Sequence, residues 1–385
     1  MIREESLIRE RVMLRAMQKD EVCTQVQKDL IAEELDNIQK ELDILRDTPK
    51  AHLQHIQEFS QKIGLQSKDT LPSEPIFLIP SRVRRRKRDL KKIIKSGLTV
   101  IDKSIIGFNP RELSIWSGSN GSGKSTVLSQ IALECVEQGF KCALFSGELD
   151  ADRVLDWMCL QAAGKRNSIS TQYENFYTVQ ESAKSRIQAW LDGNLYIYNN
   201  DHGNNAERVL KAVMSCIEEN KINTVIIDNM MSLETGSIGG DKFERQTQLV
   251  IALCRLAKKY QVHIHFVAHP RKSIGFLRKT DISGTADITN AADNVFIVHR
   301  VNVDFKKSTK QDLGFKEDNF LYSCSNVIEI CKNRDLGVQD AFAGLYFEKE
   351  SKRFLNSLGE NKRYGWESDK QGFVIADNEK LPFDE

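Results

Sequence analysis

The sequence lacks several features that would restrict its location or its chemistry. No apolar run approaches the ~18–20 residues that a membrane-spanning helix needs, and the charged N-terminus has no apolar signal-peptide core. None of the eight cysteines forms a CxxC pair, so we expect reduced thiols rather than a disulfide framework or a zinc ribbon. The formal net charge is only +1, so attraction to nucleic acid must come from a local patch. These absences predict a cytoplasmic protein with no membrane partner.

Proline and glycine are scarce at the start of the chain, where the first of each are Pro49 and Gly64. Apolar residues here recur mostly every three or four positions, which places them in one stripe on a helix. They are Val26, Ile31, Leu35, Ile38, Leu42 and Leu45. We predict that residues 1–70 form a helical N-terminal segment. It either packs on itself as a helical hairpin or docks on another subunit as a collar.

Residues 71–95 are predicted to be a linker. Three prolines within ten residues break any helix, and a basic run from Arg82 to Lys95 follows, with Asp89 as its one acid. The run is either a solvated linker or a contact for nucleic-acid phosphates. At the other end of the chain, residues 357–385 are predicted to be a tail that is rich in both charges.

Between residues 96 and 356, apolar strand-like runs alternate with stretches of helical spacing. This alternation predicts an α/β domain with a mostly parallel sheet covered by helices. The last runs have no long helices between them, so that edge is expected to be antiparallel. Expected strands are 113–118, 142–147, 195–199, 224–229, 263–269, 294–300, 327–333 and 343–348. Expected helices are 125–138, 151–163, 207–220 and 243–260.

The run GSNGSGKST matches the pattern G-x-x-x-x-G-K-[ST], and it has the required strand before it and helix after it. Its glycines let backbone N–H groups surround an anion at a helix N-terminus. Lys124 can then reach the β- and γ-phosphates, and the Ser125 hydroxyl can bind Mg²⁺. The predicted nucleotide-binding residues are Gly118, Ser119, Asn120, Gly121, Ser122, Gly123, Lys124, Ser125 and Thr126.

Two carboxylates extend this prediction. Asp228 ends a strongly strand-forming run, where a P-loop ATPase carries the aspartate that shares magnesium with Ser125; a purely structural aspartate is the alternative. The next residue is Asn229, although many P-loop ATPases carry their water-activating glutamate there. Glu148, at the end of the strand after the P-loop helix, is the candidate base, unless it only caps the following helix. This arrangement indicates the RecA-like branch of P-loop enzymes.

Six motifs resemble, in order and approximate spacing, those of DnaB-type replicative helicases, a group with the RecA fold (superfamily 4). They are GSNGSGKST, FSGEL, VIIDNMMSL, VAHPRK, DISGTADITNAADN and EICKNRD. The resemblance covers about residues 97–354 and is nearest to the phage primase-helicase and mitochondrial Twinkle branch. It implies a RecA-like ATPase core that works as a ring, expected to be a hexamer.

The resemblance also implies roles for later residues. His269 would contact the γ-phosphate and signal its loss to the following loop. Two loops would bind DNA in the central channel, and their candidate residues are Arg271, Lys272, Lys279, Ser283, Gly284 and Thr285. Arg334 would be the arginine finger that reaches the neighbouring subunit's nucleotide, with Lys332 as its companion. His263 and His265 are expected to be packing or surface residues.

We therefore predict an ATP-dependent helicase that moves 5′→3′ on single-stranded DNA during replication. The expected cofactors are Mg²⁺ and ATP or another nucleoside triphosphate. The expected partners are DNA at a replication fork, further copies of the chain and a separate primase or loader, since no primase-type zinc module or acidic cluster precedes the helicase part. A bacterial, plasmid or phage setting is expected rather than a mitochondrion. Two alternatives are a RecA-like filament-forming recombinase and a nucleotide-controlled loader or switch that does not unwind DNA.

Overall fold

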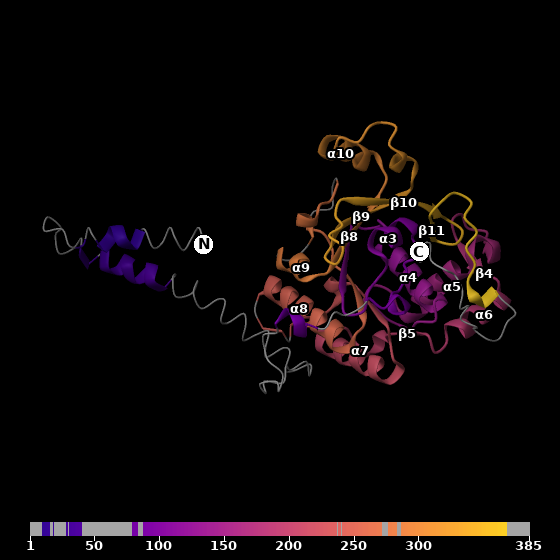
Figure 1. Cartoon of the computed structure of the whole chain (residues 1–385), viewed down its shortest axis with the longest axis horizontal. Helices are drawn as coiled ribbons and strands as arrows, with labels where there is room; N and C mark the ends of the chain where they lie inside the picture. The colour runs from indigo at the N-terminus through magenta and orange to yellow at the C-terminus, as the bar shows by residue number, and fades with distance from the viewer. Residues whose placement is uncertain are drawn as a thin grey trace.

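The computed structural model describes residues 10–15, 18, 28–29, 31–40, 79–83, 88–236, 238–239, 241–271, 276–282 and 286–367. Its main body is an α/β domain built around a nine-stranded sheet (Figure 1). In the order in which they lie side by side, the strands are β11 (Arg353–Leu355), β10 (Ala341–Glu348), β9 (Asn326–Asn333), β8 (Asn294–Arg300), β1 (Leu113–Ser117), β7 (His263–Val267), β6 (Thr224–Asp228), β2 (Cys142–Ser146) and β5 (Leu195–Ile197).

The sheet has a parallel part and an antiparallel edge. The six strands from β8 to β5 run parallel to one another, whereas β9, β10 and β11 each run antiparallel to the strand before. A separate hairpin pairs β3 (Ser168–Ser170) with β4 (Tyr177–Val179). Because parallel strands end at one edge of the sheet, the loops after β1, β2, β6 and β7 meet there.

Helices cover both faces of the sheet. One face packs against α3 (Thr99–Ile105), α4 (Lys124–Glu137), α5 (Ala151–Asn167) and α6 (Glu181–Leu191). The other packs against α7 (Ala206–Asn220), α8 (Lys242–Tyr260) and α9 (Ala286–Ala291). Along β6, Ile226 faces the first layer while Val225 and Ile227 face the second. Burial on both faces explains why the central strands are continuous apolar runs.

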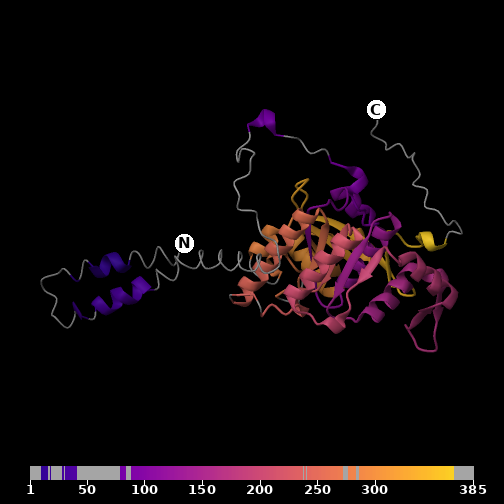
Figure 2. The ribbon, with the colours of Figure 1, turned by 90° about the horizontal axis from the view of Figure 1, so that it is seen from below.

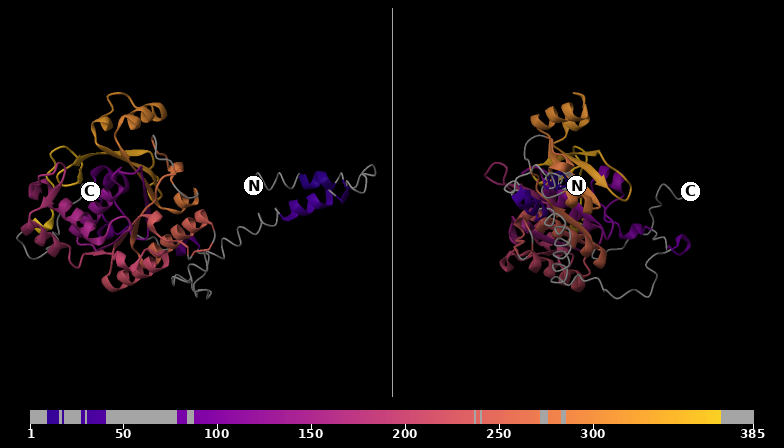
Figure 3. Two further views of the ribbon diagram at one scale, coloured as in Figure 1. Left: turned by 180° about the vertical axis from the view of Figure 1, so that it is seen from behind. Right: turned by 90° about the vertical axis from the view of Figure 1, so that its left-hand side faces the viewer.

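The remaining helical elements are short or stand at the edge. α10 (Val303–Leu313) projects from the body beyond β8 and β9 (Figures 1 and 3). The 3₁₀ helices are η1 (Pro80–Arg82), η2 (Leu90–Lys92), η3 (Asn200–His202), η4 (Met230–Ser232), η5 (Lys279–Asp281), η6 (Phe320–Ser323) and η7 (Gly365–Glu367). Among the described helices, none combines the length and the apolar character that crossing a bilayer requires.

The expected α/β architecture is confirmed, and each expected strand and helix is present with its ends within a few residues. The antiparallel edge is also confirmed. The prediction missed α3, α6, α9, α10, β3, β4 and β11. The three strands have only three residues each, too few for a periodic pattern. In α10 only Phe305 and Thr309 are buried, so this helix carries no apolar stripe.

The C-terminal part of the described chain packs against α4 and α5. Arg353 is 3% exposed, and its guanidinium donates hydrogen bonds to three carbonyl oxygens. These belong to Gln161, to Ala162 at 2.7 Å and to Lys362 at 2.7 Å. The guanidinium lies against Gly164, where α5 departs from helical geometry. Residues 357–367, at the start of the predicted tail, therefore form part of the packed body.

The described N-terminal residues are helical. Residues 10–15 and 31–40 lie side by side (Figures 1 and 2), and Arg11 Nη1 donates to Gln39 Oε1 at 2.7 Å. Ile38, from the predicted apolar stripe, is only 4% exposed. This contact agrees with the helical-hairpin alternative. The other residues of the 1–70 segment lie largely outside the described part, and so does most of the basic run.

Candidate active site

The predicted phosphate loop joins the end of β1 to the start of α4. Gly118 has a φ of +149°, and a Cβ there would lie 2.3 Å from the carbonyl oxygen of Val298. Gly123 has a φ of +98°, and a Cβ there would lie 2.7 Å from the ring of Phe354. Both positions therefore require glycine. The first amides of α4, beginning at Lys124, have no acceptor within the helix and can bind an anion.

Lys124 is 7% exposed, which is unusual for a lysine. Its Nζ donates to the carbonyl oxygens of Gly118 at 2.8 Å and Ser119 at 3.0 Å, so the ammonium lies inside the loop. Burial lowers the pKa of Lys124, while the nearby carboxylates of Asp228 and Glu148 oppose this shift. A buried cation surrounded by loop backbone is suited to a highly charged anionic ligand.

Ser125 and Asp228 meet at the base of the same cavity. Asp228 ends β6, next to β2 in the sheet, and its side chain accepts a hydrogen bond from Ser125. Burial raises the pKa of Asp228, and the hydrogen bond from Ser125 opposes that rise. A hydroxyl and a carboxylate in contact form the hard oxygen set that Mg²⁺ prefers. The residues present therefore fit the ion that the sequence predicted.

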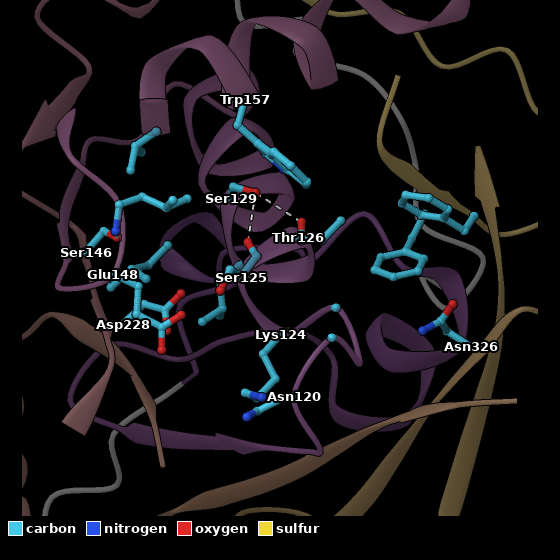
Figure 4. Close-up of a pocket in the computed structure, with 18 of the residues that line it drawn as sticks. Asn120, Lys124, Ser125, Thr126, Ser129, Ser146, Glu148, Trp157, Asp228 and Asn326 are labelled. Atoms are coloured by element: carbon cyan, nitrogen blue, oxygen red, sulfur yellow. Dashed lines mark hydrogen bonds between the residues drawn. The ribbon is translucent and has the colours of Figure 1, made fainter. Parts of the chain in front are cut away.

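Glu148 follows the tip of β2 and lies beside Asp228 on one side of α4 (Figure 4). Its side chain is 59% exposed, and His269 Nε2 lies 3.5 Å from its Oε1. The Asn229 amide donates a hydrogen bond to the same oxygen. Burial lowers the pKa of His269, and the Lys124 charge adds to this effect. No side chain caps α5, whose N-cap residue is Asp150, so the alternative role of Glu148 as a helix cap is wrong.

These groups line a cavity of about 820 Å³ that extends from the phosphate loop toward α5 and the late strands. The loop end is polar, with Lys124, Asp228 and Glu148. The far end is apolar and aromatic. Its aromatic lining residues are Trp157, Phe347 and Phe354. In Figure 4, Trp157 stands over the start of α4, on the side away from Lys124. The cavity therefore has one end for phosphates and another for a flat apolar group.

Strands from the C-terminal half hold the phosphate loop in place. Asn326 Nδ2, at the start of β9, donates to the Ser122 carbonyl oxygen at 2.8 Å. Phe354 of β11 packs against Gly123. The side chain of Gln130, on α4, pairs with both the backbone N–H and the C=O of Phe354, each at 2.9 Å. Sequence reasoning missed Asn326 and Phe354, because neither belongs to a motif with a recognisable spacing.

A family model, the DnaB-like helicase C-terminal domain, matches residues 94–356, more than half of the chain. The chain belongs to this family. DnaB-like helicases hydrolyse ATP to unwind DNA and act in replication, so the predicted enzyme class is confirmed. The likeness to the Twinkle branch stays a prediction.

Two solved structures have a similar fold. The first is an isolated ATPase domain, which matches with a TM-score of 0.54 and 17% identity, covering 69% of this chain and 91% of that chain. The second is the structure of a DnaB-like replicative helicase and its interactions with primase. It matches with a TM-score of 0.54 and 14% identity, covering 84% of this chain and 78% of that chain. These matches confirm the RecA-like fold of this DnaB-like helicase.

In this DnaB-like helicase, the two cations predicted to reach a neighbouring subunit contact their own chain. Lys332 Nζ donates to three carbonyl oxygens at the end of α9. They belong to Thr289, Asn290 and Ala292, at 2.9, 3.0 and 2.7 Å. Arg334 pairs with Asp293 at 2.9 Å, and its side chain is 49% exposed. Burial lowers the pKa of Lys332, with smaller contributions from Arg334 and Lys279. Of the two, Arg334 is the one with substantial exposure.

The described part of the helicase's predicted DNA loops begins directly after His269. Arg271 and Lys279 are both exposed. The segment between them is closed at its base, where Arg271 N donates to the Asp281 carbonyl oxygen at 2.6 Å and Pro270 bridges to Ile282. The other DNA-binding candidates, Lys272, Ser283, Gly284 and Thr285, lie outside the described residues. His263 and His265 are fully buried in β7, so the packing alternative is confirmed for them.

Proposed function

We propose that this chain is the motor subunit of a homohexameric ring that moves 5′→3′ on single-stranded DNA at a replication fork, driven by Mg-ATP. One observation carries the proposal. Lys124, Ser125, Asp228 and Glu148 line a single cavity, and His269 contacts Glu148 just before the segment that bears Arg271. The hydrolysis groups are thus connected to the predicted DNA loop through one side chain.

The nucleotide end of the mechanism follows from the side chains at the P-loop. The first amides of α4 and the Lys124 ammonium would bind the β- and γ-phosphates. Ser125 and Asp228 would hold magnesium, which when bound neutralises charge on the phosphates. Their mutual hydrogen bond in the structure supports this assignment. Glu148 would accept a proton from the attacking water, since its carboxylate is exposed to the cavity beside Asp228.

The aromatic end of the cavity would receive the nucleobase. Flat π-systems stack on aromatic rings, and an apolar lining favours a base over a phosphate. Phe347, on β10, and Trp157, on α5, line this end from different elements. The lining supports binding of a nucleoside triphosphate without distinguishing ribose from deoxyribose.

The link to DNA would run through His269. When the γ-phosphate leaves, the contacts of His269 change, and the segment 270–282 shifts with it. Arg271 and Lys279 would then move together with Lys272 and the 283–285 loop, which changes their grip on the DNA backbone. Phosphate contacts of this kind depend on salt and little on sequence.

Assembly would complete the active site. Arg334, half exposed at the end of β9, would exchange its pairing with Asp293 for the nucleotide of the next subunit, with Lys332 beside it. The helical segment 1–70 would serve as a collar, and residues 71–95 as the linker to the ATPase domain at 96–356. A primase or a loader would be a separate chain.

The test is strand displacement on forked DNA with Mg-ATP. Glu148→Gln and Arg334→Ala should each bind nucleotide but lose DNA-stimulated hydrolysis and unwinding. Arg208→Ala, an exposed arginine on α7, is the matched control. Mixing the two inactive variants should restore part of the hydrolysis, because some subunits with Glu148 will sit next to subunits with Arg334.

Other outcomes would contradict the proposal. If no mixture regains activity, Arg334 does not act across an interface. If the wild type hydrolyses ATP on DNA yet separates no fork, the function is that of a loader or switch. Open filaments in electron micrographs, instead of closed rings, would identify a recombinase-like filament former.

A further inference from the structure

Asn229 occupies a position that the proposed mechanism does not use. It follows Asp228 directly and is only 1% exposed. Its Oδ1 accepts hydrogen bonds from the backbone N–H groups of Met231 at 2.8 Å and Ser232 at 3.1 Å, which caps η4. Because both partners are donors, the oxygen must face them, and the NH₂ group of the amide must face the other way. The orientation of the Asn229 side chain is therefore fixed by its surroundings.

The NH₂ group of Asn229 is directed at the active site, where it donates to Glu148 Oε1. Glu148 stands on an exposed strand end and would otherwise be free to adopt several rotamers. His269 approaches the same oxygen from a third strand. Oε2 therefore carries neither of these two contacts. A carboxylate held through one oxygen can present the other to water.

The backbone around Asn229 is braced as well. Ser232 Oγ donates to the Asn229 carbonyl oxygen at 2.8 Å and accepts from its N–H at 3.3 Å. A Cβ on Gly147 would lie 1.8 Å from this Oγ, so the turn after β6 is in close contact with the residue before Glu148. Gly147 N also donates to the Asp228 carbonyl oxygen at 2.6 Å. The tips of β2 and β6 thus form one rigid piece.

We propose that Asn229 is a positioning residue for ATP hydrolysis: its amide holds Glu148 Oε1 and sets the direction in which the carboxylate meets water. The inference rests on the proposed role of Glu148 as the base. Many P-loop ATPases have a catalytic acid at the position of Asn229. Here the acid comes from the neighbouring strand, and an amide at that position orients it.

The test compares Asn229→Ser and Asn229→Asp with Glu148→Gln in the full chain. Serine and aspartate both retain an oxygen that can cap η4, but neither can donate an amide N–H to Glu148. Asn319→Ser is the matched control, because Asn319 caps η6 in the same way through Leu321 N at 3.0 Å. The measurements are DNA-stimulated kcat, the Kd of a fluorescent ATP analogue and Tm.

We expect Asn229→Ser to lower kcat by roughly 10–100-fold, as misplacement of a catalytic group does, with Kd changed less than about twofold. Aspartate should lower kcat further, because it places a second carboxylate against Glu148. In the Glu148→Gln background, Asn229→Ser should cause no additional loss, since Asn229 acts only through Glu148. Asn319→Ser should leave kcat near the wild-type value.

Several results would overturn the inference, and they differ from a failure of the proposed function. A normal kcat for Asn229→Ser, with kcat abolished in Glu148→Gln, rejects positioning but keeps the base. An additive loss in the double variant also rejects it, as does a loss of Kd or Tm that matches the loss of kcat. If Glu148→Gln itself turns over normally, the assignment of the base is wrong and the inference falls with it.

Discussion

Replacing Arg353 with alanine is expected to destabilise the ATPase body and to weaken nucleotide binding. The guanidinium is 3% exposed and donates to the carbonyl oxygens of Gln161, Ala162 and Lys362. Alanine would leave these acceptors without their donor and would open a space beside Gly164. The substitution thus removes the main polar connection between β11, α5 and residues 357–367.

The expected magnitude follows from the three bonds. A hydrogen bond from a charged donor contributes about 1.5–3 kcal/mol. Three such bonds do not add fully, because they share one side chain and water can enter the vacated space. We expect a loss of about 3–5 kcal/mol in the free energy of unfolding. For a domain of this size each kcal/mol lowers Tm by about 2–4 °C, so Tm should fall by roughly 10 °C.

The effect should extend to the nucleotide. Phe354 follows Arg353, packs on Gly123 and pairs through its backbone with Gln130. Loss of the anchor at Arg353 should loosen this support, so the Kd for a fluorescent ATP analogue should rise in the folded variant. Scanning calorimetry at one fixed scan rate gives the change in Tm. The matched control is Arg363→Ala, whose side chain is 60% exposed and whose loss should change Tm little.

The reasoning would be refuted by a Tm for Arg353→Ala within about 2 °C of the wild type, since that shift corresponds to less than about 1 kcal/mol. An equal fall in Tm for Arg363→Ala would also refute it. A large fall in Tm with unchanged nucleotide affinity would keep the stability argument. It would reject the coupling from β11 to the phosphate loop.

Three further predictions concern other parts of the body. Phe347→Ala should raise the KM for ATP roughly tenfold with kcat little changed, because an aromatic pair contributes about 0.5–1.5 kcal/mol; a fall in kcat alone in steady-state assays would contradict base stacking. Lys332→Met should lower the free energy of unfolding by about 1–3 kcal/mol in urea titrations, because three carbonyl oxygens lose their donor, and more than Arg334→Met does; the reverse order would contradict this. Burial lowers the pKa of His263 to about 4, so between pH 6.5 and 4 the unfolded chain takes up a proton that the folded chain refuses. Stability should therefore fall as the pH drops through this window, with about 2 kcal/mol lost at pH 5, and His263→Gln should flatten the slope in denaturant titrations from pH 5 to 7.5; an unchanged slope would exclude His263 as its source.

Much of the fold was predictable because the central strands are buried on both faces. TVIID and HIHFV are continuous β-forming runs for this reason. The phosphate loop was predictable because its glycines are required at Gly118 and Gly123 by close contacts, whatever the rest of the chain does. The carboxylates Asp228 and Glu148 could be located because parallel strands end at one edge of the sheet.

The supports of the site could not be predicted in the same way. Asn326 is 204 positions from Ser122, and a single asparagine at the start of a strand carries no periodic signal. Asn229 was visible only as the absence of an acid, since its contact with Glu148 depends on how two strand tips pack. The pairing of Lys332 with α9 depends on a register shift between β8 and β9 at Val295 and Phe296, which the hydrophobic pattern does not encode.

The late contacts on the phosphate loop have a consequence for how the protein is made. A chain that has left the ribosome as far as α9 already contains Lys124, Ser125, Glu148 and Asp228. It still lacks Asn326 and Phe354, which hold the loop. At a synthesis rate of about 5–20 residues per second, the interval between the loop and β11 lasts on the order of tens of seconds. The order of the elements along the chain therefore acts as a timer that delays a competent ATP site until nearly the whole subunit has been translated.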